Sequence, residues 1–156
     1  MPEYHERKQN RLQNYDYSQK GAYHVILCSL RQERIFSEII MLENGDVSLN
    51  LLLSGKEISG GIDELETRYP WIHVVDYCIM PNHVHLLLYF QDSIEGKRLS
   101  TVINQLKGAV RKRVGYPIWE KGYYDHIIRG EEDFVLTRKY IQENPMKWAE
   151  DKYYCP

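Results

Sequence analysis

Two histidines, His83 and His85, stand two residues apart in an apolar segment and could bind one metal ion together. Side chains of a β-strand alternate between its two faces, so a strand here would direct both imidazoles to the same side. Val84, Leu86 and Leu88 would then face a core and hold the strand rigid, as a metal site requires. Imidazole is a common metal ligand, although two histidines on one strand can also be purely structural. The spacing therefore predicts half of a metal site and leaves the remaining ligand to be found elsewhere.

A second group of reactive side chains lies near the C-terminal end of the sequence. Tyr140 and Asn144 are four residues apart, which places them near one face of a helix. An asparagine amide oxygen can bind a hard cation such as Mg²⁺ or Mn²⁺, and two imidazoles favour Mn²⁺. A phenol beside a metal-bound phosphate can act as a nucleophile. The chain has 13 tyrosines, so residue type alone does not single out Tyr140.

The elements that would position these groups follow from hydrophobic spacing and turn residues. Strands are expected over 23–30, 71–79 and 83–90, a short strand over 47–49, and helices over 51–68, from 99 to about 114 and over 131–143. The Pro81-Asn82 pair predicts a tight hairpin between the last two long strands. Residues 35–42 stay ambiguous, and 118–128 is either irregular or a strand. This order predicts an α+β fold, a ferredoxin-like (RRM-like) antiparallel sheet with helices packed on one face.

The composition is that of one globular domain. Of 156 residues, 43% are hydrophobic and 27% charged. No apolar stretch approaches the ~20 residues of a membrane span, so no membrane association is expected. Residues 1–20 lack hydrophobic periodicity and predict a basic, aromatic arm, followed by a single domain over 21–156. Three widely spaced cysteines and a polar N-terminus predict a cytoplasmic protein.

Positive charge is concentrated in two segments, although the net charge is only −2. Residues 97–115 contain six basic residues and no acidic one, and the arm carries a smaller basic group. Such clusters can simply form a solvated face. They can also bind nucleic-acid phosphates despite the negative net charge, because salt screens them from distant charges of the chain. The candidate DNA-binding residues in these segments are Arg7, Lys8, Arg11, Lys107, Arg111, Lys112 and Arg113. Arg138 and Lys139 stand beside Tyr140 and could steady a phosphate there.

Several segments resemble the motifs of one enzyme family, the HUH single-tyrosine transposases. Residues 80–87 (MPNHVHLL) resemble the HUH motif, and residues 140–145 (YIQENP) resemble the nucleophile motif. Residues 11–18 and 124–129 look like segments of the branch called REP-associated tyrosine transposases. The resemblance extends over roughly residues 7–150, nearly the whole chain. Each short motif alone is weak, whereas their order and the flanking segments together are specific.

The resemblance implies a site and a reaction. His83 and His85 would hold Mg²⁺ or Mn²⁺, Tyr140 would be the nucleophile, and Asn144 would stand where the insertion-sequence branch has a glutamine as third ligand and the REP-associated branch commonly has an asparagine. The family implies nicking and strand transfer of single-stranded hairpin DNA through a 5′-phosphotyrosine, with an RRM-like fold. It is compatible with a monomer or a homodimer. His126 lies in a matching segment but has no role that the sequence assigns.

Two other functions fit the same residues. A domesticated protein of this fold could bind hairpin DNA without cleaving it, and covalent adduct formation would separate the two. An unrelated RNA-binding module could use His83, His85 and Tyr89 as a stacking surface for bases. Metal dependence of binding would disfavour that module.

Overall fold

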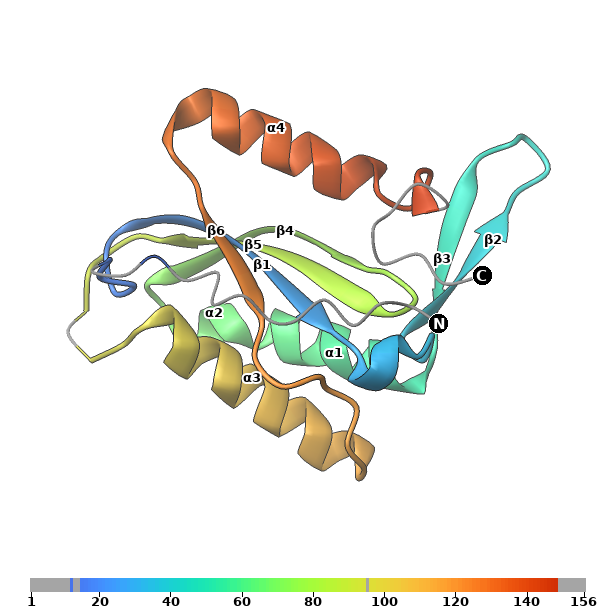
Figure 1. The fold of residues 1–156 in the computed structure, drawn as a ribbon, viewed down its shortest axis with the longest axis horizontal. Helices are drawn as coiled ribbons and strands as arrows, with labels where there is room; N and C mark the ends of the chain where they lie inside the picture. The colour runs from blue at the N-terminus through green and yellow to red at the C-terminus, as the bar shows by residue number, and fades with distance from the viewer. Residues whose placement is uncertain (1–11, 13–14, 95, 149–156) are drawn as a thin grey trace.

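The computed structural model describes residue 12, residues 15–94 and residues 96–148, and its centre is a four-stranded antiparallel sheet (Figure 1). The strand order is β4-β5-β1-β6. The strands are β1 (Gly21–Cys28), β4 (Ile72–Ile79), β5 (His83–Phe90) and β6 (Tyr124–Ile127). The first strand of the sheet lies between the third and the fourth, which is the arrangement of a ferredoxin-like β-α-β-β-α-β unit. The predicted α+β fold is thus confirmed.

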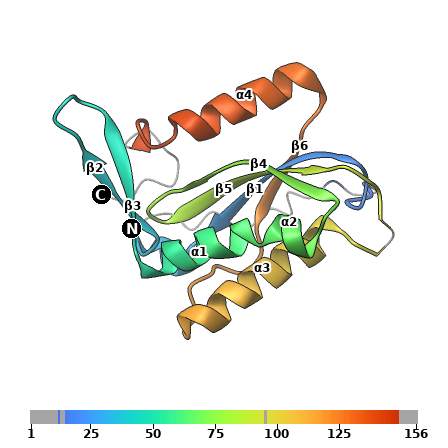
Figure 2. The same cartoon turned by 180° about the vertical axis from the view of Figure 1, so that it is seen from behind.

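Helices cover both faces of this sheet (Figures 1 and 2). The helices α1 (Leu53–Asp63), α2 (Leu65–Arg68) and α3 (Leu99–Val114) lie on one face, and α4 (Gly130–Glu143) lies on the other. The sequence predicts helices on one face of the sheet. The helices α1 and α3 of the ferredoxin-like unit do pack on one face, whereas α4 lies on the opposite one. This second face also has apolar side chains that need cover, because Cys78 of β4 and Leu87 of β5 are buried in one cluster with Ile141 of α4.

The core of the domain lies between the sheet and the pair α1 and α3. Val84, Leu86 and Leu88 of β5 point into it and are fully buried. Two buried glycines of α1, Gly55 and Gly61, allow close packing of this helix. A Cβ on Gly61 would come within 3.0 Å of Leu106 on α3, so this glycine lets the two helices approach.

The remaining segments connect these elements. The ambiguous residues 35–42 contain β2 (Ser37–Met41), which forms a separate hairpin with β3 (Val47–Leu51) that projects from the body (Figure 1). A short 3-10 turn, η1 (Leu30–Gln32), leads out of β1. Only residues 124–127 of the segment 118–128 form a strand, because the preceding part crosses from α3 and makes one isolated bridge, Trp119 to Ser29. None of the helices in the described ranges has the length and apolar character needed to cross a bilayer.

Candidate active site

The histidine pair lies on β5, and both imidazoles are fully buried. Their Nε2 atoms face each other at 3.1 Å. The Nδ1 atom of His83 lies 2.8 Å from Oδ1 of Asn82. Because an amide oxygen only accepts hydrogen bonds, His83 carries its proton on Nδ1 and presents the Nε2 lone pair toward His85. A metal-binding histidine is held in the same way, with its outer nitrogen fixed by a hydrogen bond.

His85 is oriented by a third histidine that the sequence did not single out. Its Nδ1 atom lies 3.0 Å from Nε2 of His24, on the neighbouring strand β1. A proton on Nδ1 of His85 would leave its Nε2 lone pair pointing at His83. In the β1–β5 ladder His85 is opposite Ile26, so His24 is its diagonal neighbour on the same face. Only the strand register reveals this contact, since the two residues are far apart in the sequence.

Asn144 supplies a buried amide oxygen at the end of α4. The residue is 3% exposed, and its Oδ1 atom has no hydrogen-bond partner among the described residues. Leaving such a group unsatisfied costs about 1–3 kcal/mol, which a bound cation would offset. Within the described part of the chain, no three His, Cys, Asp or Glu side chains gather as a metal site. An amide oxygen is, however, a donor that suits a hard cation such as Mn²⁺ or Mg²⁺, and imidazoles bind divalent transition metals.

Tyr140 stands beside the histidines, so the structure brings together the two motifs that the sequence separates. Its ring is 5.3 Å from the ring of His85, centroid to centroid, at an interplanar angle of 85°. The ring of His24 is 6.4 Å away. Tyr140 is 43% exposed, whereas both histidines are buried. A substrate can therefore reach the phenol from solvent, and the phenol comes from the same chain as the histidines.

The C-terminal half of α4 is fixed to β4 at a bulge. The β4–β5 register shifts between Val74 and Asp76. Gln142 donates from Nε2 to Oδ2 of Asp76 at 3.1 Å, and Nε of Arg138 lies 3.6 Å from the same oxygen. Gln142 and Arg138 are two residues on either side of Tyr140. Asp76 thus holds the stretch of helix that carries the phenol.

The first turn of α4 is fixed to β6 by Asp133. Gly130 begins the helix with φ +87°, a conformation that favours glycine. The backbone N–H of Arg129 donates to Asp133 Oδ2 at 2.8 Å, and Nε2 of His126 lies 2.9 Å from that oxygen. The Arg129 N–H foremost, and His126 after it, hold the pKa of Asp133 below its ordinary value. His126, to which the sequence assigns no role, therefore links the edge strand β6 to the start of α4.

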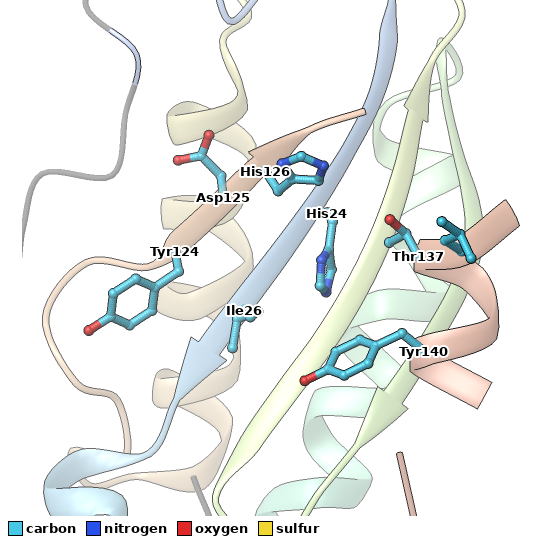
Figure 3. Close-up of a pocket in the computed structure, with 8 residues that line it drawn as sticks. His24, Ile26, Tyr124, Asp125, His126, Thr137 and Tyr140 are labelled. Atoms are coloured by element: carbon cyan, nitrogen blue, oxygen red, sulfur yellow. The ribbon is translucent and has the colours of Figure 1, made fainter. Parts of the chain in front are cut away.

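A cleft of about 430 Å³ opens beside Tyr140, between α4 and the strands β1 and β6 (Figure 3). It is lined by His24, Ile26, Tyr124, Asp125, His126, Leu136, Thr137 and Tyr140. The nucleophile candidate thus forms one wall of an opening that also contains His24, the partner of His85. Because β6 is the last strand of the sheet, the cleft lies at a sheet edge.

The basic residues of α3 are placed away from this site and are partly engaged elsewhere. The helix lies on the opposite face of the sheet from α4 (Figure 1). Lys107 donates to the backbone oxygens of Glu120 and Gly122 at 2.9 and 2.7 Å. Arg113 donates to both carboxylate oxygens of Glu64.

Arg111 and Lys112, in contrast, are exposed. They are therefore the stronger candidates on α3 for contacting DNA. Near the site, Lys139 lies 3.8 Å from Glu143 and Arg138 pairs with Asp76. Arg7, Lys8 and Arg11 lie outside the described residues, as does most of the predicted arm.

Comparisons with known proteins identify similar chains. No protein-family model matches this sequence. An uncharacterised protein of Haemophilus influenzae is 27% identical over 174 residues, which cover 96% of this chain and 94% of the relative. A second Haemophilus influenzae protein, provisionally named a REP-associated tyrosine transposase, is 26% identical over 93 residues, or 51% of this chain and 52% of the relative.

A solved structure has the same fold. It is a REP-associated tyrosine transposase bound to a REP hairpin, and it superposes with a TM-score of 0.65 at 18% identity, covering 91% of this chain and 76% of that one. The resemblance noted in the motifs is therefore matched by the fold of nearly the whole chain. The protein has the fold of a REP-associated tyrosine transposase and resembles, in half of its sequence, a second protein that carries this name.

Proposed function

We propose that the protein is a transposase that nicks and rejoins single-stranded DNA at hairpin repeats, with Tyr140 as the nucleophile. One observation carries this proposal. The Nε2 atoms of His83 and His85 face each other at 3.1 Å directly beside the half-exposed Tyr140 ring. A purely structural histidine pair would not need an accessible phenol next to it. The solved neighbour was bound to a REP hairpin, which supports hairpin DNA as the partner.

His83, His85 and Asn144 would hold the divalent metal, Mg²⁺ or Mn²⁺. When bound there, the metal would act as a Lewis acid on the phosphate and as a template for the attack. The hydrogen bonds that His85 donates to His24 and His83 donates to Asn82 orient the two imidazoles before any ion arrives. The orphan amide oxygen of Asn144 is compatible with the role of third ligand.

In the reaction, the Tyr140 oxygen attacks the phosphorus and forms a new P–O bond. The bond from phosphorus to the 3′-oxygen breaks, and the phenol proton is transferred, overall, to that oxygen. The products are a free 3′-hydroxyl and a 5′-phosphate ester on Tyr140. Attack by a second 3′-hydroxyl reverses these steps and frees the tyrosine. One phosphate ester replaces another each time, so strand transfer needs no ATP.

The RNA-binding alternative is less consistent with the structure. Stacking of bases on His83 and His85 needs exposed rings, and both are fully buried. The α4 helix also covers this face of the sheet (Figure 1).

A denaturing gel tests the proposal. Labelled hairpin oligonucleotides copied from repeats that flank the gene are incubated with the protein and Mn²⁺ or Mg²⁺. We expect a metal-dependent covalent band that disappears in Tyr140→Phe and in His83→Ala. Tyr116→Phe is the matched control, because Tyr116 is an exposed tyrosine in the loop that follows α3. Tight binding without any band in the wild type would instead support the domesticated, non-cleaving DNA-binding protein.

A further inference from the structure

The cleft beside Tyr140 has a wall built from two cross-strand pairs. His24 on β1 is opposite His126 on β6, and Ile26 is opposite Tyr124, so the four side chains share one face of the sheet. Asp125 is opposite Val25, whose side chain lies in the core on the other face. Because opposed residues point to the same side, Asp125 adds backbone rather than its carboxylate to the cleft. Figure 3 shows Tyr140 on the opposing wall, across from β1.

The lining of the cleft suits an uncharged aromatic ring. Of the eight described residues that line it, four carry rings, two are aliphatic and none is a lysine or an arginine. Among the described lining residues a phosphate would find no lysine or arginine, whereas a base could stack on the rings and pack against Ile26 and Leu136. The volume of about 430 Å³ lies within the about 300–1,000 Å³ of small-ligand sites. Stacking on aromatic side chains is how proteins commonly hold unpaired bases.

The cleft adjoins Tyr140, so a group bound in it would lie next to the reacting phosphate. Tyr140 borders both the histidine pair and the cleft. A phosphate within reach of the phenol can therefore place one of its two neighbouring nucleotides at the mouth of the cleft. The cleft lies at the edge of the sheet, beside the short strand β6, so the rest of the DNA chain can leave it without crossing the protein.

We propose that this cleft holds the unpaired base next to the scissile phosphate, stacked against Tyr124 and packed against Leu136. The inference rests on the proposed function and deepens it, because it makes one base of the single-stranded flank a recognition element. The cleft would then also position the phosphate for attack by Tyr140. Specificity at that position would come from ring size and shape more than from charge.

An abasic scan of the DNA tests this proposal without depending on cleavage. Hairpin oligonucleotides with unpaired tails carry an abasic site at each tail position in turn. Their affinity for the wild-type protein is measured by fluorescence anisotropy with a chelator present, so that no cleavage occurs. We expect one abasic position to weaken binding by about 5- to 150-fold, the range for loss of one stacked base. If no position is sensitive, the proposal is wrong.

Variants of the cleft then identify where that base lies. In Leu136→Ala and Tyr124→Ala the penalty of the sensitive abasic site should shrink toward one-fold, whereas Tyr124→Phe should keep it. Val135→Ala is the matched control, since Val135 is a neighbouring residue of α4, is 56% exposed and does not line the cleft. Tyr124 packs against Ile26 and Cys28, so its alanine variant could unfold. Leu136 is 58% exposed and can be truncated without disturbing the core.

The outcomes separate this inference from the proposed function. An unchanged abasic penalty in Leu136→Ala and in folded Tyr124→Ala would overturn the cleft assignment, even if Tyr140 forms its covalent adduct. A penalty that disappears in both variants would support the assignment, even if no adduct is ever detected.

Discussion

Asp76 should control how fast Tyr140 reacts, because it joins the helix that carries the phenol to the sheet. Asp76→Ala removes the acceptor for Gln142 and the partner of Arg138. The hydrogen bond is worth about 0.5–1.5 kcal/mol. The side chains of Arg138 and Asp76 are 50% and 23% exposed, so solvent screens their ion pair, and it adds only about 0.2–1 kcal/mol. Together they amount to about 0.7–2.5 kcal/mol, and the middle of this range, about 1–2 kcal/mol, corresponds to about 5- to 30-fold in an equilibrium constant.

Asp76→Ala would destabilise the docked position of α4 by this free energy. A smaller fraction of molecules would then hold Tyr140 facing the histidines. We expect the single-turnover rate of adduct formation to fall by about 5- to 30-fold in Asp76→Ala, with hairpin affinity unchanged. Asp76→Asn keeps an acceptor for Gln142 but loses the charge opposite Arg138, and should lie in between. Buried contacts of Ile141 with Leu87 and Met80 should keep α4 folded.

The control for this variant is another carboxylate that touches β4. Glu66 accepts from the backbone N–H of Val74 at 2.7 Å, and it belongs to α2 on the far face. Glu66→Gln should leave the rate of adduct formation unchanged. An equal fall in rate for Glu66→Gln and Asp76→Ala would refute the anchoring role, as would a loss of hairpin affinity at an unchanged rate.

Three further changes test other parts of the site. His24→Ala removes the group that orients His85, and we expect about 10- to 100-fold weaker Mn²⁺ binding in calorimetric titration; unchanged binding would remove His24 from the site. The pKa of Asp133 is lowered in the folded protein, so its contribution to stability is complete above the unfolded value near 4 and disappears as the pH falls through the folded value. The difference in urea midpoint between wild type and Asp133→Asn should therefore be constant above about pH 5 and shrink below about pH 4, and a difference that grows in acid would contradict this sign. Arg111→Ala with Lys112→Ala should lower the slope of log affinity against log salt by about 0.7–0.9 per lost phosphate contact, whereas Lys107→Ala should lower the melting temperature instead, because its contacts are within the protein.

The sequence predicts the strands and helices here because their hydrophobic patterns are strong. The HUH-like strand is apolar at Val84, Leu86 and Leu88, which face the core, and Pro81-Asn82 marks the hairpin before it. Helix α3 ends at Gly115, whose φ of +90° is the usual conformation of a glycine that follows a helix. Such features depend only on residues that are close in the sequence, so they can be predicted without a structure.

The sequence does not predict contacts that depend on strand register or on which face a helix covers. The β1–β5 pairing brings His24 to His85, and the β4 bulge turns Asp76 toward α4. The placement of α4 on the sheet face opposite α1 and α3 follows from packing of Ile141 on Leu87, which local periodicity cannot show. Similarly, Lys107 and Arg113 look like DNA-binding cations in the sequence, but the fold gives them partners within the chain.

The proposed reaction depends on a covalent bond between Tyr140 and the 5′-phosphate of a cleaved strand. Its most direct test is mass spectrometry of the protein after reaction with a hairpin oligonucleotide and Mn²⁺, followed by nuclease digestion and proteolysis. We predict a single peptide that carries a nucleotide 5′-phosphate on Tyr140 and that is absent when a chelator replaces the metal. A nucleotide on any other residue, or an adduct that forms equally well with chelator, would contradict the account.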